Sequence, residues 1–119
     1  MATQQARLPD DALVVRCGQP PFDRPKPLHE RCGEHPEGVF GFSVQCASGL
    51  ALDMLARWCR NKRVGVTTVG EIRALGYDVV TTGGLGHHAT VIVPRDWDAV
   101  SAERLVRCFQ DVANPAPRT

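Results

Sequence analysis

The most informative stretch of the sequence is Gly83-Gly84-Leu85-Gly86-His87-His88-Ala89-Thr90-Val91-Ile92-Val93-Pro94. Three glycines in four positions favour a tight, exposed turn, because glycine reaches positive φ at little steric cost. The residues after the turn alternate, so a strand would place His88, Thr90 and Ile92 on one face. The turn thus brings two imidazoles to the start of a strand, and histidine suits proton transfer or an anionic ligand because its pKa lies near neutrality. A strand that simply begins with two histidines would give the same pattern.

The composition predicts a single domain of ordinary globular character. A chain of 119 residues with 43% hydrophobic and 23% charged residues fits one domain with a real core. We expect a flexible N-terminus over residues 1–11, one domain over 12–112 and a flexible tail over 113–119. A net charge of +1 offers no electrostatic footprint for nucleic acid.

Targeting signals are not apparent in this sequence. The first residues lack the apolar core of a secretory signal, and no run approaches the roughly 18 apolar residues of a membrane span. We therefore predict a cytoplasmic protein that does not contact a membrane.

The five cysteines lie far apart and form no CxxC pair: Cys17, Cys32, Cys46, Cys59 and Cys108. An odd number without a signal peptide argues against a disulfide framework. Zinc would require Cys32 and His35 to converge with the flanking Cys17 and Cys46 in a tetrahedral set. Buried thiols acting as small apolar side chains are the commoner arrangement, so we predict no disulfide framework and no metal.

Apolar periodicity and turn residues predict the secondary structure. Strands are expected over 12–16, 39–46, 64–67, 77–81 and 87–93. Helices are expected over 28–32, over 49–61 with Ser48 as its cap, over 69–75 behind a Thr68–Glu71 capping box, and over 100–112. The proline-rich stretch 18–27 predicts a binding loop or lid. This order lacks regular βαβ alternation, so it predicts an α+β fold: one mainly antiparallel sheet with three to four helices.

Three polar residues lie on strands that otherwise look like core: Arg16, Ser43 and His88. If their strands are neighbours, a guanidinium fork, a hydroxyl and an imidazole converge on a site suited to a phosphate-bearing ligand. Two plainer arrangements are open: Arg16 paired with Asp10 or Asp11, and Ser43 facing solvent. Of the two tryptophans, Trp58 is expected in the core of its helix. Trp97 is expected to be partly exposed, or else to pack on the last helix.

The segments 13–18, 39–44 and 87–94, followed by a helix, occur in a suggestive order. The chain resembles the small ADP-ribosyltransferase-like toxins of bacteria, including type VI-secreted effectors with a degenerate form of that fold. The resemblance implies an ADP-ribosyltransferase-like fold, NAD bound by Arg16, Ser43 and His87, and catalytic roles for His88 and Ser43. It also implies a cognate antitoxin or immunity protein as partner. The Glu-x-Glu or Gln-x-Glu motif of that family is missing, so enzymatic activity stays open.

Two alternatives remain. Residues 69–80 followed by Gly86-His87-His88 resemble the HicA-type mRNA interferases, in which a histidine serves RNA cleavage. Under that resemblance His88 would act on RNA, whereas otherwise no nucleic acid is expected as a partner. The second alternative is a non-enzymatic binding, immunity or antitoxin-type module.

Overall fold

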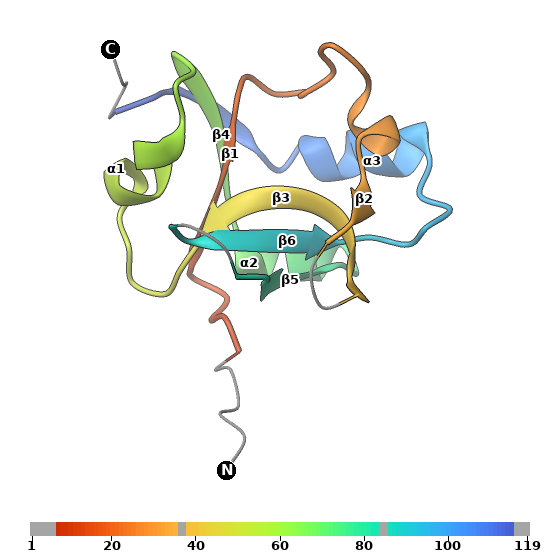
Figure 1. The fold of residues 1–119 in the computed structure, drawn as a ribbon, viewed down its shortest axis with the longest axis horizontal. Helices are drawn as coiled ribbons and strands as arrows, with labels where there is room; N and C mark the ends of the chain where they lie inside the picture. Colours follow the sequence, from red (N-terminus) through yellow and green to blue (C-terminus); the bar gives the residue numbers. More distant parts are fainter. Residues whose placement is uncertain (1–6, 36–37, 84–85, 116–119) are drawn as a thin grey trace.

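The structure is a computed structural model that describes residues 7–35, 38–83 and 86–115. Seven strands form one antiparallel sheet in the order β5-β6-β3-β1-β4-β7, with β2 beside β3 (Figure 1). The strands are β1 (Leu13–Cys17), β2 (Gly33–Glu34), β3 (Phe40–Cys46), β4 (Arg63–Thr68), β5 (Asp78–Thr81), β6 (His88–Ile92) and β7 (Gln110–Ala113). The helices are α1 (Leu52–Leu55), α2 (Val69–Ala74) and α3 (Ala99–Val106), with 3-10 turns η1 (Leu28–Glu30) and η3 (Ala56–Trp58). The prediction of an α+β domain with a mainly antiparallel sheet is confirmed.

The sequence prediction was wrong at the end of the domain, where it placed a helix over 100–112. Helix α3 begins at an Asp98 cap, whose carboxylate accepts from the Ser101 amide, and ends at Val106. Strand β7 then pairs with β4, with Val112 opposite Val64. The spacing of the apolar residues fits a helix, but the open edge of β4 offers a full ladder of hydrogen bonds, and tertiary pairing overrides local periodicity.

The helix predicted over 49–61 is also largely absent. One turn of α-helix and one 3-10 turn replace it, and the N-cap is Ala51, which makes no side-chain cap bond, instead of Ser48. The short pair still buries Leu55 and Ala56 against the sheet. Trp58, predicted as core, is 46% exposed. The apolar stripe was therefore real, but it extends over two short turns only.

A disulfide joins Cys17 at the end of β1 to Cys59 just after η3, with their Cα atoms 5.2 Å apart. The argument against a disulfide framework therefore missed this bond, because an odd total of cysteines does not prevent one pair from forming. The partners lie 42 residues apart and meet only when η3 packs on β1. Cys32, Cys46 and Cys108 remain free thiols.

Two hydrophobic clusters lie on opposite faces of β1. Val14 belongs to the larger cluster, which includes buried residues of α2 and α3, and Val15 to the smaller one beneath α1 and η3. Trp97 is 7% exposed, stacks on Phe42 and donates its indole N–H to the Tyr77 hydroxyl at 2.9 Å. The prediction of a partly exposed Trp97 is wrong, because the ring packs in the larger cluster against Phe42 and Tyr77.

Helix α2 begins as its sequence predicts, with one difference in the cap. The Thr68 hydroxyl accepts from the Glu71 amide at 3.2 Å, which confirms the N-cap. The Glu71 carboxylate accepts from the Thr67 hydroxyl at 2.6 Å, and no reciprocal bond to the Thr68 amide is seen among the described residues. Half of the capping box is thus formed as predicted.

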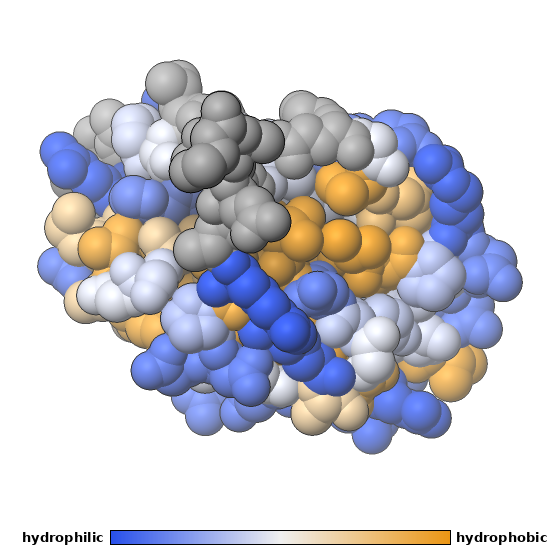
Figure 2. All heavy atoms as spheres, turned by 90° about the horizontal axis from the view of Figure 1, so that it is seen from below, coloured by the Kyte–Doolittle hydropathy of each residue, from blue (hydrophilic) through white to orange (hydrophobic). Residues whose placement is uncertain are grey.

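Strand β5 forms one edge of the sheet, and the segment before β1 runs past it. Arg73 donates to the Leu8 carbonyl and to the carboxylates of Asp10 and Asp78, all at 2.7–2.9 Å. On the face seen from below, a hydrophobic area is bordered by long hydrophilic side chains (Figure 2). Within the described ranges, no helix is long and apolar enough to cross a membrane.

The sheet splits beside the middle of β3, and this split positions the site. β1 pairs with β3 only through Val14 and Val15, opposite Cys46 and Gln45. The first half of β3 pairs instead with β2, through Gly33 opposite Gly41. The chain between β1 and β2 passes over the split as the proline-rich loop and η1 (Figure 1). Among the described residues, no strand therefore pairs with the edge of β3 near Ser43 on that side.

Candidate functional site

Arg16 fills the split between β1 and β3. Its Nη1 donates to the Ser43 carbonyl at 2.6 Å, so the side chain replaces a ladder bond of the sheet. The guanidinium carbon lies 5.2 Å from the ring centre of Phe42 and 5.4 Å from that of Phe22, a cation–π distance on both sides. The ion pair with Asp10 considered above is made by Arg73 instead.

The Phe22 ring reaches Arg16 because β4 carries a glycine beneath it. A Cβ at Gly65 would overlap the Phe22 ring and touch Pro20. Phe22 adopts a φ of 59°, and its amide donates to the Gln19 carbonyl at 2.9 Å. The proline-rich loop is thus folded down onto the sheet and forms one wall of the site.

The charge on Arg16 has no carboxylate to balance it among the described residues. Burial, and to a smaller extent the positive charge of Arg31, lower the pKa of Arg16 to about 10, against a smaller raising influence of Cys32. Its Nε is buried and has no hydrogen-bond partner in the described part of the chain. A buried cation with a free donor and a cationic neighbour favours binding an anion.

Ser43 and His88 are in direct contact on the neighbouring strands β3 and β6. Ser43 pairs with Thr90, so His88 lies diagonally opposite Ser43 on the same face. The Ser43 hydroxyl and His88 Nε2 are 3.1 Å apart. Ser43 therefore joins Arg16 and His88, with its carbonyl bound by the first and its hydroxyl by the second.

Two buried threonines continue this chain on the other side of the imidazole. His88 Nδ1 lies 2.7 Å from the Thr82 hydroxyl, which lies 3.0 Å from the Thr90 hydroxyl. Thr82 and Thr90 are almost fully buried. Four side chains from three segments thus form one hydrogen-bonded line. Sequence reasoning missed Thr82, although Thr90 on the face of His88 was a signal that this face is polar.

His35 adds a second imidazole to this face of the sheet. Its ring centre lies 6.0 Å from that of His88, and its Nε2 is 3.1 Å from the Gly41 carbonyl. Burial lowers the pKa of His88, and the nearby His35 lowers it further. His88 therefore favours the neutral form, which can accept a proton near neutral pH.

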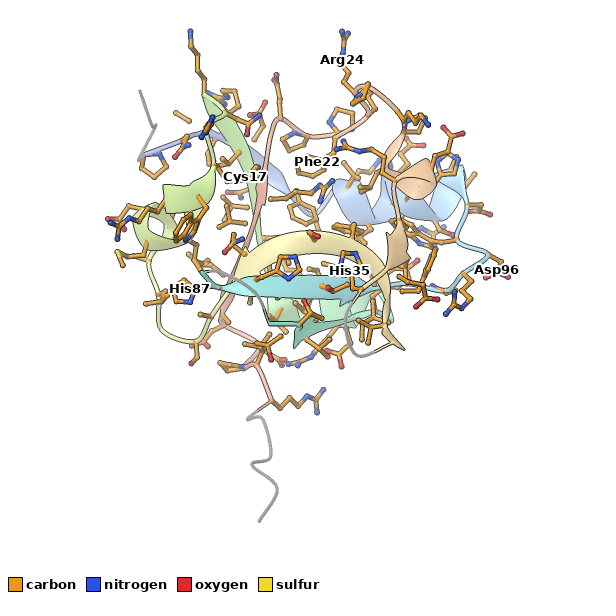
Figure 3. All side chains as sticks on the ribbon, in the orientation of Figure 1. Cys17, Phe22, Arg24, His35, His87 and Asp96 are labelled. Carbon is orange, nitrogen blue, oxygen red and sulfur yellow. A yellow bond between two sulfur atoms is a disulfide. The ribbon has the colours of Figure 1, made fainter. Side chains whose placement is uncertain are left out.

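His87 lies at the other end of the β3–β6 pair from His35 (Figure 3). Its amide donates to the Gln45 side-chain carbonyl at 3.0 Å, and its own carbonyl accepts from the Cys46 amide at 2.9 Å. The flanking glycines take positive φ, 73° at both Gly83 and Gly86, as the turn requires. Residues 84–85 of the predicted turn lie outside the described residues. His87 is thus placed by its backbone, apart from the contact between Ser43 and His88.

Two adjoining cavities lie at this end of β1, and Arg16 lines the smaller of them. The smaller, about 220 Å³, is lined by Arg16, Arg31 and Ser43 among others. The larger, about 500 Å³, lies under the proline-rich loop and shares Cys17 and Arg31 with the first. Arg31 is held there by donating to the Arg24 carbonyl at 2.9 Å. Sequence reasoning did not single out Arg31, which lies in a short 3-10 region without a motif.

The zinc arrangement considered from the sequence is excluded. Cys17 is bound to Cys59, and Cys46 points into the main core. Across the described ranges, no group of three or more histidine, cysteine or acidic side chains is placed to hold a metal ion.

No protein-family model matches the chain, and no match is found among the curated proteins or the solved structures.

Proposed function

We propose that the protein binds a phosphorylated ligand of the NAD type in the cleft at Arg16, as the resemblance to small ADP-ribosyltransferase-like toxins implies. The observation that carries this proposal is that Ser43 contacts both of the other residues, with its carbonyl bound by Arg16 and its hydroxyl in contact with His88. Arg31 lowers the pKa of Arg16 and His35 lowers that of His88, and no carboxylate is among the groups that shift either pKa. Such a site favours a ligand that brings its own negative charge.

The residues present fit a diphosphate. The Nε of Arg16 is buried without a hydrogen-bond partner, and Arg31 lines the same cavity as Arg16. A guanidinium fork matches phosphate oxygens in pairs, a geometry that an ammonium group cannot reproduce. The larger adjoining cavity, at about 500 Å³, leaves room for further parts of such a ligand and falls within the range of about 300–1,000 Å³ for ligand pockets.

The proposed chemistry differs from that of the glutamate-bearing family. NAD supplies an ADP-ribosyl group whose bond to nicotinamide breaks during transfer. In this chain the base that takes the acceptor's proton would be neutral His88, and Ser43 would hold the ligand beside it. The adjacency of β1, β3 and β6, which carry the three residues, supports an ADP-ribosyltransferase-like fold.

Calorimetric titration with NAD tests the proposal. We expect binding heat for the wild type and affinity at least about tenfold weaker for Arg16→Lys, because lysine loses the paired geometry. Arg104→Lys, on an exposed turn of α3, is the matched control and keeps the wild-type affinity. Absence of NAD binding would refute the proposal. RNA cleavage that depends on His88 and ignores Arg16 would replace it with the interferase alternative.

A cellular experiment tests the toxin part of the proposal. Induction of the wild-type chain in a bacterial host should arrest growth, and Arg16→Ala or His88→Ala should relieve the arrest. Circular dichroism of the purified variants checks that they are folded. Normal growth with the wild-type chain would favour a binding or immunity module instead.

A further inference from the structure

The hydrogen-bonded line Ser43–His88–Thr82–Thr90 has the parts of an activated nucleophile. A hydroxyl contacts one imidazole nitrogen at 3.1 Å, and a buried hydroxyl contacts the other at 2.7 Å. Nucleophilic serines are activated in this way, by a base whose ring is oriented by a third group. Ser43 also lines the cavity that Arg16 and Arg31 line.

We propose that Ser43 is a nucleophile that attacks esters bearing an anionic group, with His88 as general base and Thr82 as the residue that positions His88. This activity does not depend on NAD. In the active tautomer of His88, Nδ1 carries the proton and donates a hydrogen bond to the Thr82 hydroxyl. The unprotonated Nε2 then accepts a hydrogen bond from the Ser43 hydroxyl. Thr82 in turn donates to Thr90, whose full burial keeps water from competing at that position.

The reaction has two balanced steps. The Ser43 oxygen bonds to the ester carbonyl carbon, and its proton passes to His88 Nε2. The bond from that carbon to the alcohol oxygen breaks, and His88 returns the proton to the departing alcohol. A water molecule then attacks the acyl-serine through the same base, which releases the acid and restores Ser43.

The cationic side of the cavity sets the substrate class. Arg16 and Arg31 line it, and no carboxylate is among the residues around it. An acyl chain that ends in a carboxylate or phosphate would be held there, whereas a neutral ester would gain nothing from these charges. Negative charge that develops on the attacked carbonyl oxygen would be stabilised by the same field.

A fluorophosphonate probe tests the nucleophile, since it forms a bond from phosphorus to an activated serine oxygen and releases fluoride. We expect labelling of the wild type at Ser43 by peptide mass spectrometry, and none in Ser43→Ala. Removal of the base in His88→Ala should slow labelling about 100-fold or more. Ser48→Ala, an exposed turn serine, is the matched control with wild-type labelling. An unlabelled wild type, or equal rates with and without His88, would overturn the proposal.

Conservative variants of Thr82 distinguish a positioning role from a purely structural one. Thr82→Val removes the hydroxyl and should slow labelling about tenfold, whereas Thr82→Ser retains it and should restore the rate. Nitrogen NMR of the imidazole should show the Nδ1-protonated tautomer in the wild type and in Thr82→Ser, and a mixture in Thr82→Val. An unchanged tautomer together with an unchanged rate in Thr82→Val would exclude the positioning role.

The substrate class is tested with two esters of p-nitrophenol. The wild type should hydrolyse the succinate monoester, which carries a carboxylate, faster than the neutral acetate, and Arg31→Gln should reduce that preference. A preference for the acetate would refute the anionic class. The labelling experiment and the NAD titration can fail independently. Labelling without NAD binding supports the nucleophile and refutes the proposed function. NAD binding without labelling supports the proposed function and refutes the nucleophile.

Discussion

The disulfide between Cys17 and Cys59 makes a strong quantitative prediction. It closes a loop of 42 residues, and the chain-entropy model gives about 4 kcal/mol of stabilisation for such a loop at 25 °C. A domain of this size has a free energy of unfolding of only about 5–15 kcal/mol. Reduction should therefore remove a large share of the stability. At a urea m-value of about 2 kcal/mol per molar, the unfolding midpoint should fall by about 2 M.

Urea unfolding followed by tryptophan fluorescence, with and without dithiothreitol, measures this fall. The double variant Cys17→Ala, Cys59→Ala should unfold like the reduced wild type and should not respond to the reductant. Cys32→Ala, which removes a free thiol, is the matched control and should retain the full response. Alkylation of the unfolded, unreduced protein should modify three of the five cysteines. A midpoint that reduction leaves unchanged would refute the argument from loop closure.

Three further predictions concern packing and titration. Gly41→Ala should lower the free energy of unfolding by about 1–3 kcal/mol or more, because a Cβ there would collide with a carbonyl of β6. Its register partner Gly33 has open space around it, so Gly33→Ala should change little in the same urea experiment. Burial and the second imidazole, His35, lower the pKa of His88 in the folded protein, so the unfolded chain binds more protons around pH 6.5. The free energy of unfolding should therefore fall as the pH drops through that value. Urea midpoints measured at neutral and mildly acidic pH should show a smaller fall in His88→Gln. Tyr77→Phe leaves the buried Trp97 indole N–H without its acceptor and should cost about 1–3 kcal/mol by urea unfolding, with an equal midpoint in the variant counting against that bond.

Local patterns in the sequence predicted most of the sheet. Strict alternation over residues 87–93 and 39–46 located β6 and β3, because one face of each strand is buried and a period of two results. The same alternation predicted that His88 and Thr90 lie on one face of the strand, and the structure places them there. From the sequence, the strands over 39–46 and 87–93 were expected in one sheet beside residues 13–16. The order β6-β3-β1 places Arg16, Ser43 and His88 on neighbouring strands.

The failures share one physical cause, which is that tertiary contacts override local preference. Residues 110–113 follow a helical period but take the open edge of β4. Cys59 lies at the end of a predicted helix but is drawn to Cys17 by packing across the sheet. Thr82 and Arg31 could not be found because neither lies in a motif, and their importance arises only from what they contact.

Arg16 would both hold the sheet together and contact a ligand, and this affects how any affinity measured at this site is interpreted. Its Nη1 already holds the Ser43 carbonyl, so a ligand that draws the guanidinium toward itself competes with a bond inside the protein. A measured dissociation constant is then the difference between two interactions of one cation. Tight binders will be those that leave the carbonyl bond intact, whereas ligands that pull Arg16 away will weaken the connection between the two halves of the sheet as they bind.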